Sequence, residues 1–187
     1  MKTLICILLI IYTLPGVSQT INRNEIDEAT NTRVITTNPW EVKPNINEPT
    51  IYPFFKYLKT EKGRGLYFLA FKILNVDNIG CLREKTGQVL ITFENGENIL
   101  LKQQSDTNCD YGDYEVSYYL VSKPEAKDPN WLKKMNKHYD MLLQNNVASI
   151  AVKGSKDTIQ FDLEENRKDI IAKHAKLISN ELEEISN

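Results

Sequence analysis

The stretch Gly87–Gln104, GQVLITFENGENILLKQQ, decides the fold class of this chain. Asn95-Gly96 at its centre is a dipeptide typical of hairpin turns, and β-favouring residues lie on both sides of it. Upstream, Leu66–Val76 is a nearly continuous apolar and aromatic run, which indicates a strand buried on both faces. Downstream, Tyr114–Val121 is rich in residues that favour strands. Together these segments predict an antiparallel sheet.

The register of the central hairpin follows from which side chains must share a face. A two-residue loop would place Val89 opposite Lys102. A three-residue loop, with Gly96 in the left-handed conformation, places Val89 opposite Leu101. The longer loop gathers the apolar side chains of both arms on one face. Because cross-strand neighbours share a face, we predict the three-residue loop.

The same register has a consequence for the cysteines. Continued beyond the hairpin, it places Cys81 opposite Cys109, at the separation that a disulfide needs, unless Gly80–Gly87 contains a bulge or a break. The remaining cysteine, Cys6, lies in the N-terminal apolar run. The rest of the chain has an even count of cysteines, which in an oxidising compartment indicates one disulfide. We therefore predict that Cys81 and Cys109 form one.

Two helices and a second hairpin complete the predicted fold. Asp128-Pro129 is typical of a helix start, and apolar residues recur at helical spacing over Trp131–Leu143. Val147–Val152 and Thr158–Leu163 indicate two short strands, and a closing helix is expected over about Glu165–Ile185. The apolar stripe of that helix comprises Ile170, Ile171, His174, Leu177, Ile178, Leu182 and Ile185. We predict an α+β fold in which an antiparallel sheet of about six strands packs against two helices, one of them C-terminal.

The N-terminus has the order of residues found in secretory signal peptides. Lys2 supplies a positive charge, Leu4–Tyr12 is apolar, and Pro15-Gly16 is followed by small residues. The apolar run is shorter than the ~20 residues that span a bilayer. We expect residues 1–18 to be a signal peptide and the mature chain to start near Gln19.

Composition divides the rest of the chain into two parts. Residues 19–50 are polar and contain Pro39, Pro44 and Pro49, so we expect an extended leader there. Residues 51–187 are expected to form a single α+β domain. A mature chain of about 169 residues is long enough to bury its own core.

The charge of the mature chain argues against two classes of partner. The sequence has 23 basic and 25 acidic residues, and only Lys2 lies in the signal, so the net charge without the signal is −3. Surfaces that bind nucleic acid or anionic membranes are basic. We therefore expect no nucleic-acid partner and no binding to an anionic membrane surface. The signal peptide predicts a secreted or periplasmic location, with no membrane-spanning segment after signal removal.

Aromatic residues supply the candidate binding surface. Such side chains stack on sugars and form contact hot spots with proteins. They are also favoured in strands, so part of the group is expected to lie in the core, and Trp40 in the leader could instead pack onto the domain. The candidate surface comprises Tyr111, Tyr114, Tyr119, Trp131 and Trp40.

The sequence contains no recognisable catalytic or metal-binding motif. His138 and His174 have no His or Cys partner at metal-ligand spacing. We expect His138 on a solvated face and His174 as a hydrogen-bonded histidine at the edge of the apolar stripe. Four carboxylates near Cys109 could hold Ca²⁺, but their spacing differs from an EF-hand loop and favours a polar turn. They are Asp106, Asp110, Asp113 and Glu115. We predict no catalytic residue, no metal and no cofactor.

Four features occur in a fixed order along the chain. They are a signal peptide that ends before a glutamine, the strand Tyr67–Phe71 (YFLAF), a following cysteine, and the hairpin turn Phe93–Gly96 (FENG). With the closing strand and helix, this arrangement resembles small exported proteins of unknown function from Bacteroidetes. The resemblance covers about residues 60–185. It implies an exported α+β domain and brings no catalytic residues.

By elimination, the sequence predicts an exported, non-enzymatic binding or accessory module of the periplasm or cell envelope. Its expected partner is a protein or a glycan of the envelope. The alternatives are a small secreted hydrolase or enzyme inhibitor, and a purely structural accessory domain. A cleft that holds a carboxylate pair or His138 with a perturbed pKa would favour the enzyme, whereas a flat, exposed aromatic patch would favour binding.

Overall fold

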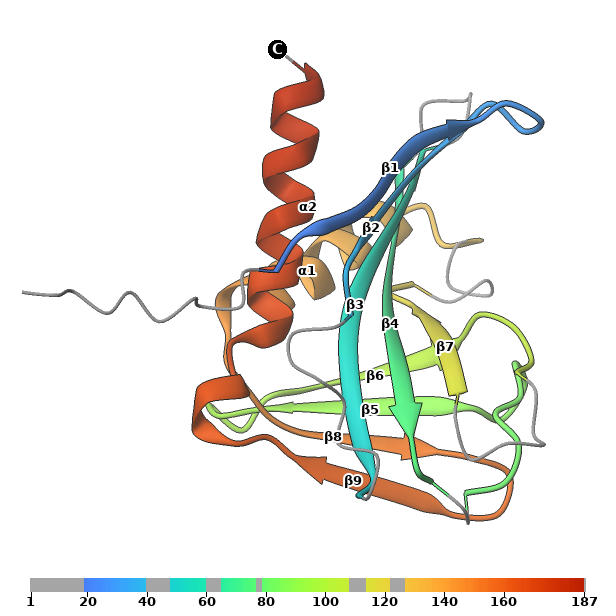
Figure 1. The fold of residues 1–187 in the computed structure, drawn as a ribbon, viewed down its shortest axis with the longest axis vertical. Helices are drawn as coiled ribbons and strands as arrows, with labels where there is room; N and C mark the ends of the chain where they lie inside the picture. Colours follow the sequence, from blue (N-terminus) through green and yellow to red (C-terminus); the bar gives the residue numbers. More distant parts are fainter. Residues whose placement is uncertain are drawn as a thin grey trace, which may run out of the picture.

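The computed structural model confirms the α+β class and corrects the number of strands. Among the described residues, one antiparallel sheet contains nine strands, not about six, and two α-helices pack with it (Figure 1). The predicted signal peptide, residues 1–18, lies outside the described part. The structure describes residues 19–39, 48–59, 65–76, 79–107, 114–121 and 127–186.

Two of the additional strands lie in the segment predicted to be an extended leader. β1 (Ile21–Asp27) and β2 (Thr32–Thr37) form an antiparallel hairpin at one end of the sheet. β1 is polar and exposed along most of its length, so no alternation of apolar residues marks it as a strand. Its pairing with β2 holds it in place, together with a hydrogen bond from the Asn24 amide to Glu181 in the last helix.

The third additional strand is β3 (Thr50–Lys59), which pairs along its whole length with β4 (Gly65–Leu74). Pro53 lies inside β3, and a proline has no N–H to donate to a neighbouring strand. β2 pairs only with the last four residues of β3. Phe55 directs its N–H to Thr37 on that side, and alternation places Pro53 on the same, unpaired side. The missing N–H therefore costs the sheet no hydrogen bond.

The central hairpin has the predicted register. β5 (Gln88–Phe93) pairs with β6 (Asn98–Gln103), and Val89 lies opposite Leu101. Gly96 has a φ of 83°, and its N–H donates to the carbonyl oxygen of Phe93 at 3.0 Å. The three-residue loop with a left-handed glycine is thereby confirmed.

The later strands also lie where the sequence predicted them. β7 (Tyr114–Tyr119) pairs with β4 on one side and with the end of β6 on the other. β8 (Val147–Lys153) and β9 (Thr158–Asp162) form the second hairpin, and β8 pairs with β5.

Both predicted helices form, with ends that differ from the sequence pattern. α1 (Trp131–Gln144) begins after Asn130, whose N–H donates to the carboxylate of Asp128 at 2.8 Å. The closing segment is divided into a short 3-10 turn, η2 (Glu165–Arg167), and α2 (Ile170–Ser186). α2 therefore starts five residues after the expected helix start near Glu165, at the first residue of the apolar stripe.

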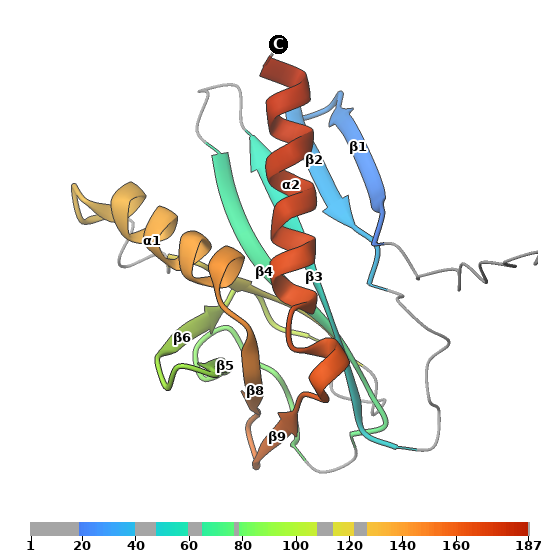
Figure 2. The ribbon, with the colours of Figure 1, turned by 90° about the vertical axis from the view of Figure 1, so that its left-hand side faces the viewer.

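The sheet is strongly twisted and bends over itself. Its strands follow the order β1-β2-β3-β4-β7-β6-β5-β8-β9. Figures 1 and 2 show that β5, β6, β8 and β9 run across β3 and β4, and that α2 lies along β2 and β3. Buried side chains of both halves and both helices form one core cluster. The bend brings β9 close to the start of β3.

Candidate functional site at the edge of the sheet

β9 is the last strand of the sheet, and one side of it has no neighbouring strand among the described residues. On the other side, the N–H of Leu163 donates to the carbonyl oxygen of Ala148 in line with β8, at 2.9 Å. Because successive residues of a strand direct their backbone groups to opposite sides, Gln160 and Asp162 direct theirs away from β8. No described residue forms a hydrogen bond with these outward backbone groups. β9 thus presents N–H and C=O groups that have no partner among the described residues.

A cleft lies beside this free edge. Its volume is about 640 Å³, and its walls come from two segments that are distant in the sequence. One wall is Glu48–Tyr52 at the start of β3, and the other is β9 with the two residues that follow it. A neighbouring hollow of about 290 Å³ shares Pro49 and Ile159 with the cleft. Open space therefore follows β9 over its length.

The β3 wall of the cleft has few free backbone groups. Just beyond this wall, Pro53 has no N–H, and the N–H of Phe55 donates to Thr37 Oγ1 at 2.9 Å. The carbonyl oxygen of Ile51 accepts a hydrogen bond from Arg167 at 2.9 Å. Of the two walls, β9 is consequently the one that can pair with an added strand.

Arg167 fixes η2 to the start of β3. Besides its hydrogen bond to Ile51, its guanidinium lies 5.6 Å from the centre of the Tyr52 ring, a cation–π distance. Its Nε is buried and has no hydrogen-bond partner in the described part of the chain. The charge of Arg167 is therefore directed at a carbonyl group and an aromatic ring rather than at a carboxylate.

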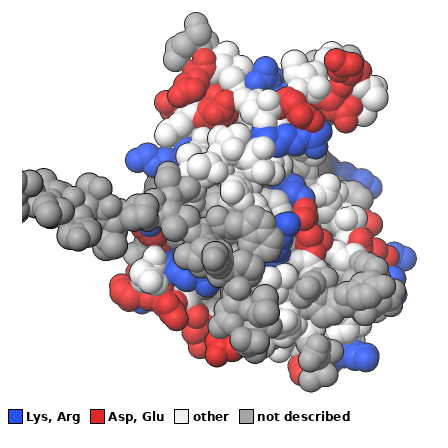
Figure 3. Space-filling model, in the orientation of Figure 1, with Lys and Arg blue, Asp and Glu red and all other residues white. Residues whose placement is uncertain are grey.

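The rim of the cleft is acidic. Glu48, Asp162 and Glu164 line it and are exposed, and Arg167 is the one basic residue among the described lining residues. Asp162 accepts a hydrogen bond from the side-chain amide of Gln160 at 2.7 Å. Figure 3 shows acidic side chains gathered at the lower left, over η2 and the adjoining end of β9. The lining carries three carboxylates against one guanidinium.

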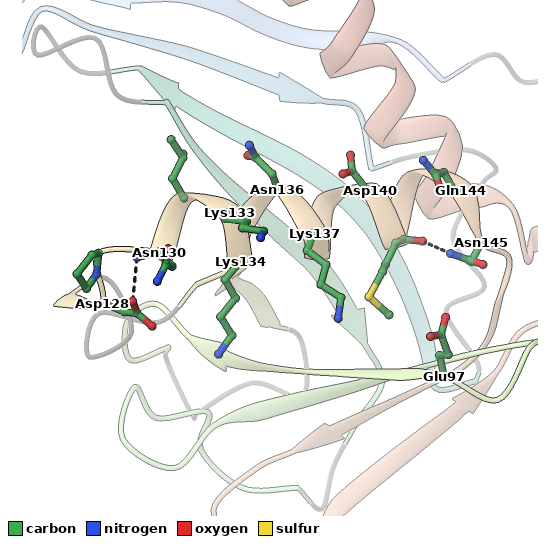
Figure 4. Close-up of a pocket in the computed structure, with 13 residues that line it drawn as sticks. Glu97, Asp128, Asn130, Lys133, Lys134, Asn136, Lys137, Asp140, Gln144 and Asn145 are labelled. Atoms are coloured by element: carbon green, nitrogen blue, oxygen red, sulfur yellow. Dashed lines mark hydrogen bonds between the residues drawn. The ribbon is translucent and has the colours of Figure 1, made fainter.

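A larger hollow, of about 1080 Å³, borders the exposed side of α1. Figure 4 shows Lys134 and Lys137 on one side of this helix and Asn136 and Asp140 on the other. The charges are mixed, and the backbone of the helix forms its own hydrogen bonds. Among the residues that line this hollow, Leu132 is the large apolar side chain most exposed to solvent, at 49%. This arrangement defines no particular ligand.

The structure separates the described members of the predicted aromatic surface. Tyr114 is buried, and its hydroxyl donates to the carbonyl oxygen of Gly80 at 2.9 Å. Tyr119 lies on the opposite face of β7 with its ring 5.3 Å from that of Phe68. Trp131 is half-buried against the core. Trp40 and Tyr111, the other two members, lie outside the described residues.

The two histidines lie in different surroundings. His138 is half-buried rather than fully solvated, because its Nδ1 lies 2.6 Å from the carbonyl oxygen of Leu120. His174 is fully buried on α2, not at the edge of the apolar stripe as the sequence predicted. Neither histidine lines one of the two larger hollows described above.

The carboxylates considered for Ca²⁺ have other partners or lie outside the described part. Asp106 accepts the N–H of Glu84 at 2.7 Å, and this hydrogen bond is the main cause of the lowered pKa of Asp106. Glu115 forms ion pairs with lysines of β3 and β4. Asp110 and Asp113 are outside the described residues. Within the described ranges, no three His, Cys, Asp or Glu side chains are grouped as metal ligands.

Comparisons with protein-family models, with curated proteins and with solved structures give no match for this chain. The resemblance to exported proteins of Bacteroidetes accordingly stays a prediction. Among the helices that the structure describes, none has both the length and the apolar character needed to cross a membrane.

Proposed function

We propose that this chain is an exported, non-enzymatic protein of the cell envelope that binds a protein partner, and that it does so by adding a strand of the partner to β9. The observation that supports this most is the free edge of β9. Gln160 and Asp162 direct unpaired backbone groups toward a cleft that the start of β3 borders. A strand docked there gains backbone hydrogen bonds and two side walls.

The composition of β9 favours strand addition. Exposed edge strands normally carry a lysine, a proline or a bulge that prevents pairing with other chains. β9, with the sequence TIQFD, has neither lysine nor proline, and its pairing with β8 is regular. Apart from the charged Asp162 at its end, β9 carries no such protection, and a weakly protected edge beside a cleft suits strand addition.

A protein partner fits the structure better than a glycan. Sugar sites commonly present exposed aromatic rings on which the sugar stacks. Among the described members of the aromatic group that the sequence singled out, Tyr114 is buried, and Tyr119 and Trp131 are half-buried. A secreted enzyme inhibitor, one of the alternatives, is itself a protein-binding protein and is compatible with the same edge.

The proposal is tested by removing a single outward N–H. Gln160→Pro deletes the N–H that faces solvent and leaves the ladder to β8 intact, and prolines are tolerated at such edge positions. The matched control is Gln160→Thr, which keeps the N–H and suits a strand. The probe is a short fluorescent peptide of alternating threonine and valine with blocked ends, and fluorescence anisotropy reports its binding.

We expect the parent and Gln160→Thr to bind the probe equally, and Gln160→Pro to bind it about tenfold more weakly. The tenfold loss of affinity has two causes: the variant lacks one hydrogen bond of ~1 kcal/mol, and the proline ring displaces the bound strand. Far-ultraviolet circular dichroism checks that the proline variant is folded. A folded Gln160→Pro protein that binds as tightly as the parent, or a parent that does not bind, would contradict the proposal.

A further inference from the structure

We infer that the strand accepted by β9 alternates aliphatic and basic residues, so that the partner presents an extended cationic peptide. This inference rests on the proposed strand addition and specifies its ligand. It follows from the two faces of β9 and from the charges at the rim of the cleft.

The two faces of β9 differ sharply in polarity. Phe161 is 9% exposed and Ile159 is half-buried, and both side chains point toward the core. Thr158, Gln160 and Asp162 are exposed on the other face. An added strand continues the pleat of the sheet, so its side chains alternate between the same two faces.

On the inner face, the added side chains meet an apolar wall. Ile51 of β3 is fully buried and lines the cleft together with Ile159 and Phe161. A polar side chain placed there would lose its hydration without a matching hydrogen bond. This face therefore selects aliphatic residues at alternate positions of the ligand.

On the outer face, the added side chains meet carboxylates. No described cation lies within ion-pair distance of Glu48, Asp162 or Glu164. Lys168 is nearby in the sequence, but it pairs with Glu94 at 2.7 Å and with Glu165 at 2.6 Å. The guanidinium of Arg167 is directed at Ile51 and Tyr52. A lysine or arginine of the ligand would supply the missing positive charge.

The inference is tested with two fluorescent peptides of equal length, one alternating lysine with valine and the other alternating glutamate with valine. Both are measured by anisotropy against the parent, Asp162→Asn and Glu165→Gln. Asp162→Asn keeps the shape of the rim and removes a cleft charge. Glu165→Gln removes a neighbouring charge that does not line the cleft and is already paired with Lys168.

We expect the lysine peptide to bind the parent at least about tenfold more tightly than the glutamate peptide. Asp162→Asn should reduce this preference about threefold, and Glu165→Gln should leave it unchanged. Added salt should weaken the lysine peptide more than the uncharged threonine peptide, because exposed ion pairs are screened.

The outcomes separate this inference from the proposed function. Equal binding of both charged peptides, each weakened by Gln160→Pro, would overturn the charge preference and leave strand addition standing. If neither Asp162→Asn nor Gln160→Pro alters binding of the lysine peptide, the peptide binds elsewhere. That outcome would overturn both the charge preference and strand addition to β9. No binding of any peptide to the folded parent would also overturn both.

Discussion

Tyr139 connects α1 both to α2 and to the sheet. Its hydroxyl donates to the carbonyl oxygen of Ala175 at 2.6 Å, and its ring stacks on that of Tyr67 with centroids 4.3 Å apart. Burial raises the pKa of Tyr139 above its usual 10, so the hydroxyl keeps its proton for this hydrogen bond even in alkaline solution. A single residue thus fixes the position of one helix relative to two other elements.

Ile178 tests whether α2 docks on the sheet through its apolar stripe. This side chain is 0% exposed, whereas Ile185 in the same stripe is 40% exposed. Ile178→Ala should lower the free energy of unfolding by about 2–5 kcal/mol, because it removes buried methyl groups and leaves a cavity. The control, Ile185→Ala, should change it by less than about 1 kcal/mol. Urea unfolding measures the free energy of unfolding of both variants. Equal losses in the two variants would show that α2 does not dock through the face that contains Ile178.

The hairpin β5–β6 forms as predicted because all its information is local. Beyond it the regular pairing stops, since the N–H of Gly87 turns to the carbonyl oxygen of Arg83 at 2.6 Å. The regular register therefore ends within Gly80–Gly87, where the sequence analysis allowed for a bulge or a break. The two segments nevertheless stay adjacent, because the N–H of Thr107 donates to the carbonyl oxygen of Leu82 at 2.9 Å. Cys81 directly precedes this contact.

The disulfide between Cys81 and Cys109 remains a prediction, because Cys109 lies outside the described residues. The contact between Leu82 and Thr107 supports it by bringing the two segments together. We expect no free thiol in the denatured mature protein, counted with a thiol reagent. Cys109→Ser should lower the free energy of unfolding by about 3–4 kcal/mol, as the chain-entropy model gives for a loop of this length. Two free thiols per mature chain would refute the bridge.

Glu115 joins three strands through charge. Its carboxylate on β7 lies 3.0 Å from Lys56 Nζ on β3 and 3.7 Å from Lys72 Nζ on β4. Burial on its own would raise the pKa of Glu115, but the hydrogen bonds and charges of the two lysines outweigh it and lower the pKa below the usual 4.5. The ionised form therefore stabilises the folded state, in a half-exposed site where each pair contributes little.

This arrangement predicts a pH dependence of stability. Because the folded-state pKa of Glu115 is lowered, its contribution is present above the usual pKa of 4.5 and is lost as the pH falls through the folded-state value. Glu115→Gln should be less stable than the parent at neutral pH, and the difference should shrink in acid. Glu28→Gln, an exposed turn residue, is the control. Urea unfolding at neutral pH and below pH 4.5 measures the free energy of unfolding of each protein. A difference between the parent and Glu115→Gln that stays constant with pH would contradict the prediction.

In the whole molecule, the order of strands determines where the site lies. β4 pairs with β7 and β5 pairs with β8, so segments distant in the sequence alternate across the sheet. This order leaves β9 at an end, and the twist of the sheet brings the start of β3 beside it (Figure 2). The same five residues inside the sheet would have no free backbone groups. The proposed site is therefore a property of the topology.

The candidate site could not be predicted from the sequence for the same reason. The alternation in Thr158–Leu163 predicted a half-buried strand, and the structure has one there. Nothing in that alternation says whether a strand is central or terminal, because its two neighbours are chosen elsewhere in the chain. Aromatic density pointed instead to Tyr114, which alternation along β7 places in the core.

The sequence by itself determined the elements whose signal is local. The turn at Gly96, the register of its hairpin, the strand around Phe71 and the stripe containing Ile178 all depend on neighbours within a few residues or one periodic face. The tertiary structure decided the strands that lack such a signal. β1 is polar, and the proline inside β3 argues against a strand although the residues around it favour one; in the structure both strands are held by partner strands, and β1 also by a hydrogen bond to α2. It also decided that β9 ends the sheet beside a cleft, since long-range pairing, unlike local pattern, depends on the whole chain at once.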